Sequence, residues 1–279
     1  MSRPRLPTRL AALGPMALVT SASDGIGRAA AADLARLGFD LLLVARRGDA
    51  LRELAEDLRM AHNVTVDVLA ADLGTAAGVQ DVTQAIAGRD IGVGVLAAGF
   101  GTSGGFTNAD LAEETSMLDV NCRAVLVLSH ELARAMAKKG RGQLVLFGSI
   151  VGFQGNGSTA TYSATKAYIQ SLAEGLARDL APSGVHVLSV APGPVHSGFA
   201  GRAGMTMGAA ARPEAVSRGI TAALGSSGTI RPGLLSKILG YNMATLPRFL
   251  RIRLMTRIMT CMAGKSGQTA RPAAREANL

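Results

Sequence analysis

Tyr162 and Lys166 lie four residues apart in a segment with helical periodicity, and this spacing places two side chains on one face of a helix. An ammonium group beside a phenol favours the phenolate and lowers the pKa of the phenol toward the working pH, which suits proton transfer. Ser149 ends an apolar run directly after Gly148, and a hydroxyl at the carboxyl end of a strand faces the crevice where open α/β sheets bind ligands. We expect these side chains to perform acid–base chemistry on a bound small molecule.

A glycine-containing turn joins the first apolar run to the helix that follows it. The turn reads Thr20-Ser21-Ala22-Ser23-Asp24-Gly25-Ile26-Gly27. Glycines at a strand-to-helix turn let backbone N–H groups approach a pyrophosphate, whose charge the helix N-terminus favours. The turn lacks the common G-x-G-x-x-G spacing, so by itself it fits a tight turn without a ligand equally well.

Strands and helices that alternate along the chain must position these residues. Short apolar runs rich in Val and Leu predict strands over residues 16–20, 41–45, 64–69, 93–97, 144–147 and 185–190. Helical periodicity predicts helices over residues 27–37, 49–61, 76–87, 111–136 and 161–180. Apolar strands with intervening helices are typical of a parallel sheet covered on both faces. The sequence therefore predicts an α/β fold: a doubly wound, Rossmann-type parallel sheet in a single domain over residues 1–232, with a basic, apolar C-terminal extension over residues 233–279.

In order and spacing, these positions resemble the short-chain dehydrogenase/reductase family. The glycine segment of that family, T-G-x-x-x-G-x-G, is similar to residues 20–27, and its catalytic Asn, Ser, Tyr and Lys are similar to Asn121, Ser149, Tyr162 and Lys166. The resemblance implies an oxidoreductase that transfers hydride between a nicotinamide and a carbonyl or secondary alcohol. It implies that Tyr162 gives or takes the proton and that Ser149 holds the carbonyl oxygen. Lys166 would then lower the Tyr162 pKa and hold the nicotinamide ribose, and Asn121 would position a water.

The resemblance also implies a set of cofactor contacts. Asp72-Leu73 looks like the pair that contacts adenine, and Pro192-Gly193-Pro194-Val195 with Ser197 looks like the segment that holds the nicotinamide carboxamide. Two positions depart from the family pattern: Ser21 replaces the first glycine, and Leu96-Ala97-Ala98-Gly99 replaces Asn-Asn-Ala-Gly. The candidate cofactor-binding residues are Thr20, Ser21, Ser23, Asp24, Gly25, Ile26, Gly27, Arg46, Arg47, Asp72, Leu73, Ala98, Gly99, Asn121, Tyr162, Lys166, Pro192, Gly193, Val195 and Ser197.

The end of the second predicted strand bears on the choice between NADP(H) and NAD(H). A carboxylate in the position of Ala45 would bind the 2′-hydroxyl of NAD and repel a 2′-phosphate. Ala45 removes that repulsion, Arg46 offers a planar donor fork suited to phosphate, and Arg47 adds a second cation. Asp24 counts against NADP(H), because it places an acid in the glycine turn, and a solvated basic turn is the alternative interpretation of the arginines. The pattern favours NADP(H), with NAD(H) as the alternative.

Residues 198–211 lie where the resembled family has its substrate-covering segment. Their glycines suit a mobile lid, and Phe199, Met205 and Met207 offer soft apolar contacts. A lid over a hydrophobic carbonyl or alcohol substrate, such as an acyl or steroid-like ketone, and an irregular loop packed on the domain are both consistent with this composition.

The excess of basic over acidic residues lies entirely in the C-terminal part of the chain. The net charge is +9, and residues 1–214 are neutral, with 19 basic and 19 acidic side chains. The extension predicts helices over residues 234–241 and from Pro247 to about residue 262. We expect the second helix to pack over the substrate cleft or a neighbouring subunit, with its arginines at the rim. Contact with a membrane surface is the less favoured alternative.

Composition excludes several classes of protein. Hydrophobic residues make up 48% and charged residues 18% of the chain, which excludes a disordered protein. Two cysteines are too few for a disulfide framework or a zinc site, so we expect no metal and a cytoplasmic protein, with a location peripheral to a membrane as the alternative. The neutral domain and scarce aromatic residues argue against nucleic-acid binding. We expect a homo-oligomer, a dimer or a tetramer, and a non-catalytic nucleotide-sensing or scaffold protein remains the alternative function.

Overall fold

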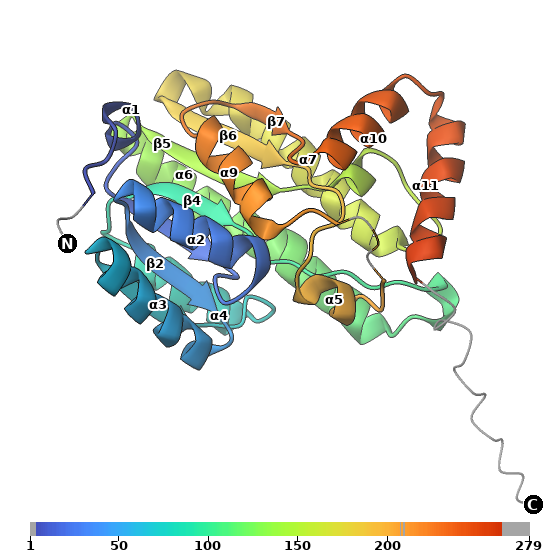
Figure 1. The fold of residues 1–279 in the computed structure, drawn as a ribbon, viewed down its shortest axis with the longest axis horizontal. Helices are drawn as coiled ribbons and strands as arrows, with labels where there is room; N and C mark the ends of the chain where they lie inside the picture. The colour runs from blue at the N-terminus through green and yellow to red at the C-terminus, as the bar shows by residue number, and fades with distance from the viewer. Residues whose placement is uncertain (1–3, 207, 209, 264–279) are drawn as a thin grey trace, which may run out of the picture.

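The computed structural model describes residues 4–206, 208 and 210–263. A seven-stranded parallel sheet forms its centre, in the order β3-β2-β1-β4-β5-β6-β7 (Figure 1). The strands are β1 (Met16–Thr20), β2 (Asp40–Ala45), β3 (Val66–Ala70), β4 (Ile91–Leu96), β5 (Gly142–Phe147), β6 (Val185–Val190) and β7 (Gly228–Ile230). The six predicted strands are confirmed to within two residues at each end. The sequence did not predict β7, because three residues that begin with glycine form no apolar run.

Helices cover both faces of the sheet, which confirms the doubly wound fold. On one face, α2 (Gly25–Leu37), α3 (Gly48–His62) and α9 (Pro213–Ala223) bury Leu34, Leu51 and Ile220 against the strands. On the other face, α4 (Ala76–Ile86), α6 (Val125–Lys139) and α7 (Ala160–Asp179) bury Val82 and Leu128. Strand residues therefore face apolar helices on both sides, as their near-continuous hydrophobicity predicts.

The predicted helix over residues 111–136 is wrong in one respect, because it is interrupted. It consists of α5 (Leu111–Leu118), a π-helical turn at Asp119–Ala124 and α6. A single π turn inserts one residue without breaking the helical path, so the apolar periodicity on both sides hides it. Such turns occur frequently at functional sites, and this one holds Asn121 in a buried position.

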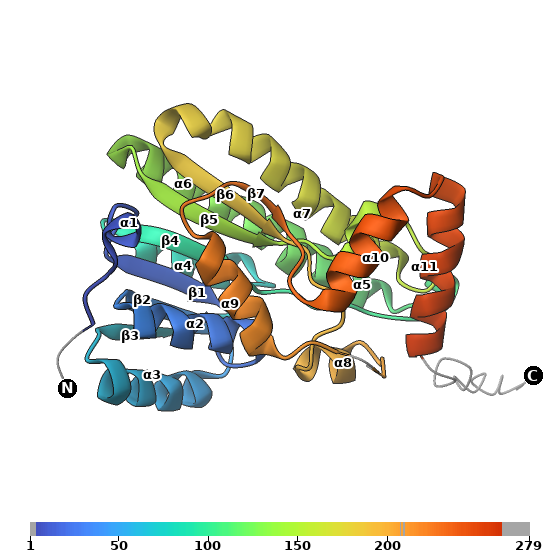
Figure 2. The ribbon, with the colours of Figure 1, turned by 45° about the horizontal axis from the view of Figure 1, so that its top comes forward.

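The C-terminal extension contains α10 (Leu234–Ala244) and α11 (Arg248–Ala263), which stand at one end of the molecule beside α7 and α5 (Figures 1 and 2). The helices that the sequence predicts there are present: α10 ends three residues later than expected, and α11 matches its predicted bounds to within one residue. Met255 and Met259 of α11 are buried in a cluster with Phe100 and Tyr162 of the main domain. The boundary at residue 232 stays a prediction, and residues 264–279 lie outside the described chain.

Polar contacts also attach the extension to the domain. The Ser236 hydroxyl accepts a hydrogen bond from the Gly193 N–H at 2.7 Å, and the Thr256 hydroxyl accepts one from Gly157 at 3.2 Å. The Met262 carbonyl accepts a hydrogen bond from Thr206 at 2.7 Å. Within the described residues, no helix is both long enough and apolar enough to cross a membrane.

Candidate active site

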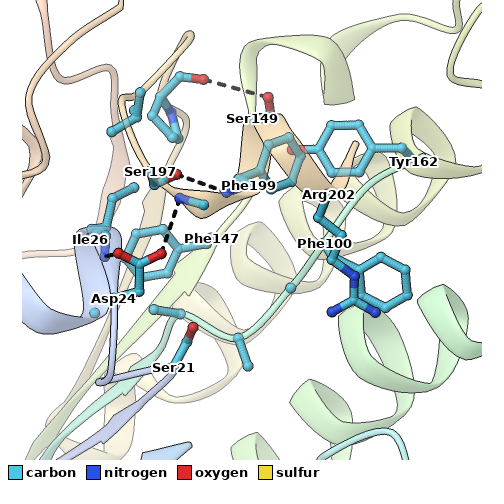
Figure 3. A pocket seen from close by; sticks show the side chains of 18 of the residues that line it. Ser21, Asp24, Ile26, Phe100, Phe147, Ser149, Tyr162, Ser197, Phe199 and Arg202 are labelled. Carbon is cyan, nitrogen blue, oxygen red and sulfur yellow. Dashed lines mark hydrogen bonds between the residues drawn. The ribbon is translucent and has the colours of Figure 1, made fainter. Parts of the chain in front are cut away.

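A cavity of about 840 Å³ lies at the carboxyl ends of the central strands (Figure 3). Small-molecule sites range over roughly 300–1,000 Å³, so this volume suits a large ligand together with a second, smaller one. All but two of the predicted site residues line the cavity, and the exceptions are Thr20 and Asn121. Among the described residues, no group of three or more His, Cys, Asp or Glu side chains could hold a metal ion.

Ser149, Tyr162 and Lys166 meet at one end of this cavity. Helix α7 carries Tyr162 and Lys166 on one face, both buried, and the Lys166 Nζ lies 5.7 Å from the centre of the tyrosine ring. The Lys166 Nζ donates a hydrogen bond to the Phe147 carbonyl at 2.8 Å. Ser149 caps the 3₁₀ turn Ile150–Phe153 and accepts a hydrogen bond from the Val151 N–H. The spacing in the sequence therefore gives the expected grouping of a phenol, an ammonium and a hydroxyl.

The pKa of Tyr162 is displaced in the direction opposite to the one predicted. Burial raises the pKa of Tyr162 to about 12, against a weaker lowering by the hydrogen bond with Ser149. Burial also lowers the pKa of Lys166 to about 8. The sequence indicated that the lysine charge would dominate. In the structure the cost of placing a phenolate in a buried position is larger, and the ammonium is directed at the Phe147 carbonyl.

Asn121 supports the site from outside the cavity. Its amide nitrogen donates hydrogen bonds to the Phe100 carbonyl at 2.8 Å and to Thr165 Oγ1 at 3.1 Å, and its Oδ1 accepts one from the Phe100 N–H at 3.0 Å. Both amide hydrogens are therefore used within the protein. Gly99 allows this close packing, because a Cβ there would lie 3.0 Å from Asn121 Oδ1. The role of Asn121 in positioning a water stays a prediction.

The glycine turn adopts the tight backbone path that its sequence predicts. Gly25 has a φ of +54° at the start of α2, and a Cβ on Gly27 would lie 2.3 Å from the Ser21 carbonyl oxygen. Asp24 caps α2 by accepting a hydrogen bond from the Gly25 N–H at 2.7 Å, and its second oxygen accepts one from the Gly198 N–H at 3.0 Å (Figure 3). Thr20 stands behind the turn, where its hydroxyl accepts a hydrogen bond from the Ala98 N–H at 3.0 Å.

Ser21 takes a left-handed backbone conformation, with a φ of +56°. This conformation costs a non-glycine residue about 1–2 kcal/mol, whereas glycine loses about 0.5–1 kcal/mol through its freer unfolded chain. We expect Ser21→Gly to stabilise the fold by about 0.5–1 kcal/mol and to raise Tm by about 1–4 °C. Ser23→Gly is the matched control in the same turn, and it should lower Tm, because Ser23 lacks a positive φ. A lower Tm for Ser21→Gly would show that the serine side chain contributes more than its backbone costs.

Two arginines line the end of the cavity where the family resemblance places the adenosine of the cofactor. The Arg47 guanidinium donates hydrogen bonds to the Ser23 carbonyl at 3.1 Å and to the Ser23 hydroxyl at 3.3 Å. Arg46 is exposed and lines the cavity beside Ala45. Ala45, at the end of β2, contributes no carboxylate. The backbone amides of the glycine turn, the start of α2 and these cations fit a nicotinamide dinucleotide.

Sequence reasoning missed Arg202, which lies on the short helix α8 (Gly198–Arg202). Its guanidinium carbon stands 3.6 Å from the centre of the Phe100 ring (Figure 3). Burial lowers the pKa of Arg202, and the charge of Arg46 lowers it further. Arg202 stood within the segment predicted as a lid, but nothing in the sequence indicated that it would face the same cavity as Arg46.

Apolar side chains line the other end of the cavity, beside Tyr162. The Phe199 ring lies 5.4 Å from the Tyr162 ring, centre to centre, and Met205 is buried next to it. Met207 lies outside the described residues. Helices α10 and α11 add Leu239, Met255, Ile258, Met259 and Met262 to the lining. The sequence predicted that the second helix of the extension packs over the substrate cleft or a neighbouring subunit, and residues of α11 line this cavity.

Characterised proteins are similar to this chain over most of the main domain. The sequence model of the short chain dehydrogenase family matches residues 15–207. A 7beta-hydroxysteroid dehydrogenase from Clostridium sardiniense is 32% identical over 180 residues, which cover 64% of this chain and 69% of that protein. A very-long-chain 3-oxoacyl-CoA reductase from Podospora anserina is 34% identical over 179 residues, which cover 62% of this chain and 53% of that protein.

A solved structure is similar to this chain in both fold and sequence. The short-chain dehydrogenase from Sphingobium yanoikuyae in complex with NADPH is 30% identical, with a TM-score of 0.76 over 84% of this chain and 97% of that one. The family match spans more than half of the chain, and the parallel sheet places a Ser, a Tyr and a Lys together at its carboxyl edge. The chain therefore belongs to the short-chain dehydrogenase/reductase family.

Proposed function

We propose that this protein is an NADP(H)-dependent oxidoreductase that interconverts a ketone and a secondary alcohol on a hydrophobic substrate. The observation that carries the proposal is the convergence of Ser149, Tyr162 and Lys166 on one cavity that continues to the glycine turn. The reaction class of the family supports it.

The side chains have distinct roles in the proposed reaction. The nicotinamide, when bound, donates or accepts the hydride. Tyr162 donates a proton to the carbonyl oxygen during reduction, and its pKa of about 12 keeps the phenol protonated at neutral pH. Ser149, whose hydroxyl lines the same cavity as Tyr162, donates a hydrogen bond to the same oxygen. Lys166 supplies a positive charge behind Tyr162 and holds the nicotinamide ribose. Together these groups supply the proton and the positive charge that reduction of a carbonyl requires.

Several observations favour NADP(H) over NAD(H). Ala45 leaves room for a phosphate, Arg46 is exposed beside it, and the charge of Arg46 lowers the pKa of Arg202, which lines the same cavity. A phosphate bound beside Arg46 would offset this unfavourable interaction between two positive charges. The bound NADPH in the similar Sphingobium yanoikuyae structure is consistent with this preference.

The cavity lining favours a bulky apolar substrate, which we propose to be an acyl, steroid-like or other hydrophobic ketone. Methionine side chains adapt to irregular apolar ligands, and Met205, Met255 and Met259 surround the space beside Tyr162. The names of the two curated relatives, a hydroxysteroid dehydrogenase and a very-long-chain 3-oxoacyl-CoA reductase, point to the same substrate class.

A turnover assay tests the proposal. Purified protein is incubated with NADPH and a panel of long-chain acyl, steroid and small aromatic ketones, and NADPH consumption is followed. We expect turnover of bulky apolar ketones above that of the small ones. A protein that binds NADPH tightly but turns over no member of the panel would instead support the nucleotide-sensing alternative.

The lowered pKa of Lys166 predicts an alkaline limit to catalysis. A lysine with a pKa of about 8 is charged below that pH and loses its charge above it. We expect kcat for ketone reduction to be level between about pH 6 and pH 7 and to fall above about pH 8. Lys166→Arg should remove this limb, because a guanidinium stays charged beyond about pH 12. A limb near pH 8 that persists in Lys166→Arg would assign it to another group.

The proposal also covers the oligomeric state and the cellular location of the protein. We propose a homo-oligomer in the cytoplasm, and the two free cysteines, Cys122 and Cys261, are consistent with a reducing compartment. Sedimentation velocity on the full chain measures the assembly directly.

A further inference from the structure

The C-terminal extension carries a basic charge that the proposed reaction does not use. All of the net charge of +9 falls after residue 214, and residues 215–275 contain no acidic side chain. Four of the arginines belong to α11, at positions 248, 251, 253 and 257. No ion pair among the described residues involves any of these four. This charge attracts an anionic partner.

Helix α11 is apolar on two opposite faces. Its inner face buries Met255 and Met259, with exposed fractions of 1% and 5%. Its outer face exposes Phe249, Leu250 and Leu254 by 58%, 38% and 40%, and the exposed Arg253 and Arg257 lie between them. We call the residues Phe249, Leu250, Arg253, Leu254 and Arg257 the outer face of α11. Helix α11 stands at the end of the molecule away from α2 and α3 (Figures 1 and 2).

The composition of the outer face selects among possible partners. Single exposed apolar residues are ordinary on a protein surface, but here three of them share one helix face with two exposed arginines. A symmetric contact with a second copy would bring both sets of these arginines into one interface without an acidic residue in the helix to compensate. Nucleic acid would satisfy the arginines but leave the phenylalanine and leucines without a partner.

An anionic lipid surface satisfies both kinds of side chain. Apolar residues of an interfacial helix enter the boundary between headgroups and acyl chains, and arginine stems extend so that the guanidinium groups reach the phosphates. We propose that the outer face of α11 docks this protein on an anionic bilayer, while the inner face of the same helix lines the cavity. The cavity then opens beside the surface in which hydrophobic ketones dissolve. The docking itself does not depend on the proposed reaction.

Vesicle sedimentation with the full chain tests the docking. The probes are phosphatidylcholine vesicles with and without phosphatidylglycerol, at low and high salt. We expect binding to the anionic vesicles that weakens with salt, because the Debye length falls from about 10 Å at 0.1 M to about 3 Å at 1 M. Each arginine near an anionic surface contributes about a fivefold change in partition, so Arg253→Gln with Arg257→Gln should weaken binding about 25-fold.

Two further variants distinguish binding through the outer face of α11 from attraction by the net charge of the protein. Leu250→Ser with Leu254→Ser should remove the part of the binding that remains at high salt. Arg36→Gln with Arg52→Gln removes the same charge from α2 and α3, where both side chains are exposed, and should leave binding unchanged. Thermal unfolding confirms that each variant folds.

Three outcomes would overturn the proposal. The wild-type protein could fail to bind anionic vesicles. The control pair could weaken binding as much as the α11 pair, which would assign the attraction to net charge alone. The α11 substitutions could dissociate an oligomer in sedimentation velocity without changing vesicle binding, which would assign the outer face to a second copy of the chain.

Discussion

Replacement of Tyr162 by phenylalanine is expected to lower kcat for ketone reduction by a factor of about 10²–10⁴, the usual contribution of a positioned general acid. The phenol is the group that we propose to supply the proton, and its pKa of about 12 keeps that proton in place at neutral pH. Phenylalanine fills the same buried space and removes only the hydroxyl. The affinity for NADPH should therefore change little, as measured by equilibrium fluorescence titration beside steady-state turnover.

Tyr168→Phe is the matched control for that substitution. Tyr168 lies on α7 as well, but its side chain is 38% exposed and it does not line the cavity. Its substitution should leave kcat and Tm unchanged. Near-full turnover by Tyr162→Phe would reject the proton-transfer role, whereas equal losses in both variants would indicate damage to α7.

The strands and the grouping of the candidate catalytic side chains could be predicted because local patterns determine them. Apolar runs identify strands that are buried on both faces. A parallel sheet brings the ends of its strands to one edge, so Ser149 after β5 and the glycine turn after β1 had to open on the same crevice. The four-residue spacing of Tyr162 and Lys166 then determines their common face on α7.

Features that depend on packing could not be predicted from local patterns. The π turn at Asp119–Ala124 adds a residue without disturbing the apolar periodicity on either side. The direction of the Tyr162 pKa depends on how completely the folded chain removes water from the phenol. The position of Arg202 over Phe100 depends on how the segment after β6 folds back over the cavity. Each of these is set by contacts between residues far apart in the sequence.

The chemistry at the end of β2 predicts the second large effect, a change of cofactor preference. Ala45→Asp introduces a carboxylate that accepts a hydrogen bond from a ribose 2′-hydroxyl and repels a 2′-phosphate. Arg46→Ala removes a cation whose charge-assisted contact with that phosphate contributes about 1.5–3 kcal/mol. We expect the double variant to lower the ratio of kcat/KM for NADPH to that for NADH by at least about a hundredfold, because each 1.4 kcal/mol is worth about a factor of ten.

The Arg47→Ala variant tests whether Arg47 binds the 2′-phosphate or only stabilises the glycine turn. The Arg47 guanidinium is already bonded to the Ser23 carbonyl and hydroxyl, so its removal should loosen the turn and weaken NADPH and NADH binding alike, with the ratio of kcat/KM nearly unchanged. A ratio that shifts as strongly in Arg47→Ala as in the double variant would assign the phosphate contact to Arg47. If the ratio of kcat/KM stays constant in Arg47→Ala and in the double variant, the residues at the end of β2 do not bind the 2′-phosphate. Arg202 lines the same cavity and its pKa is lowered by the charge of Arg46, so it would then be the residue to substitute next.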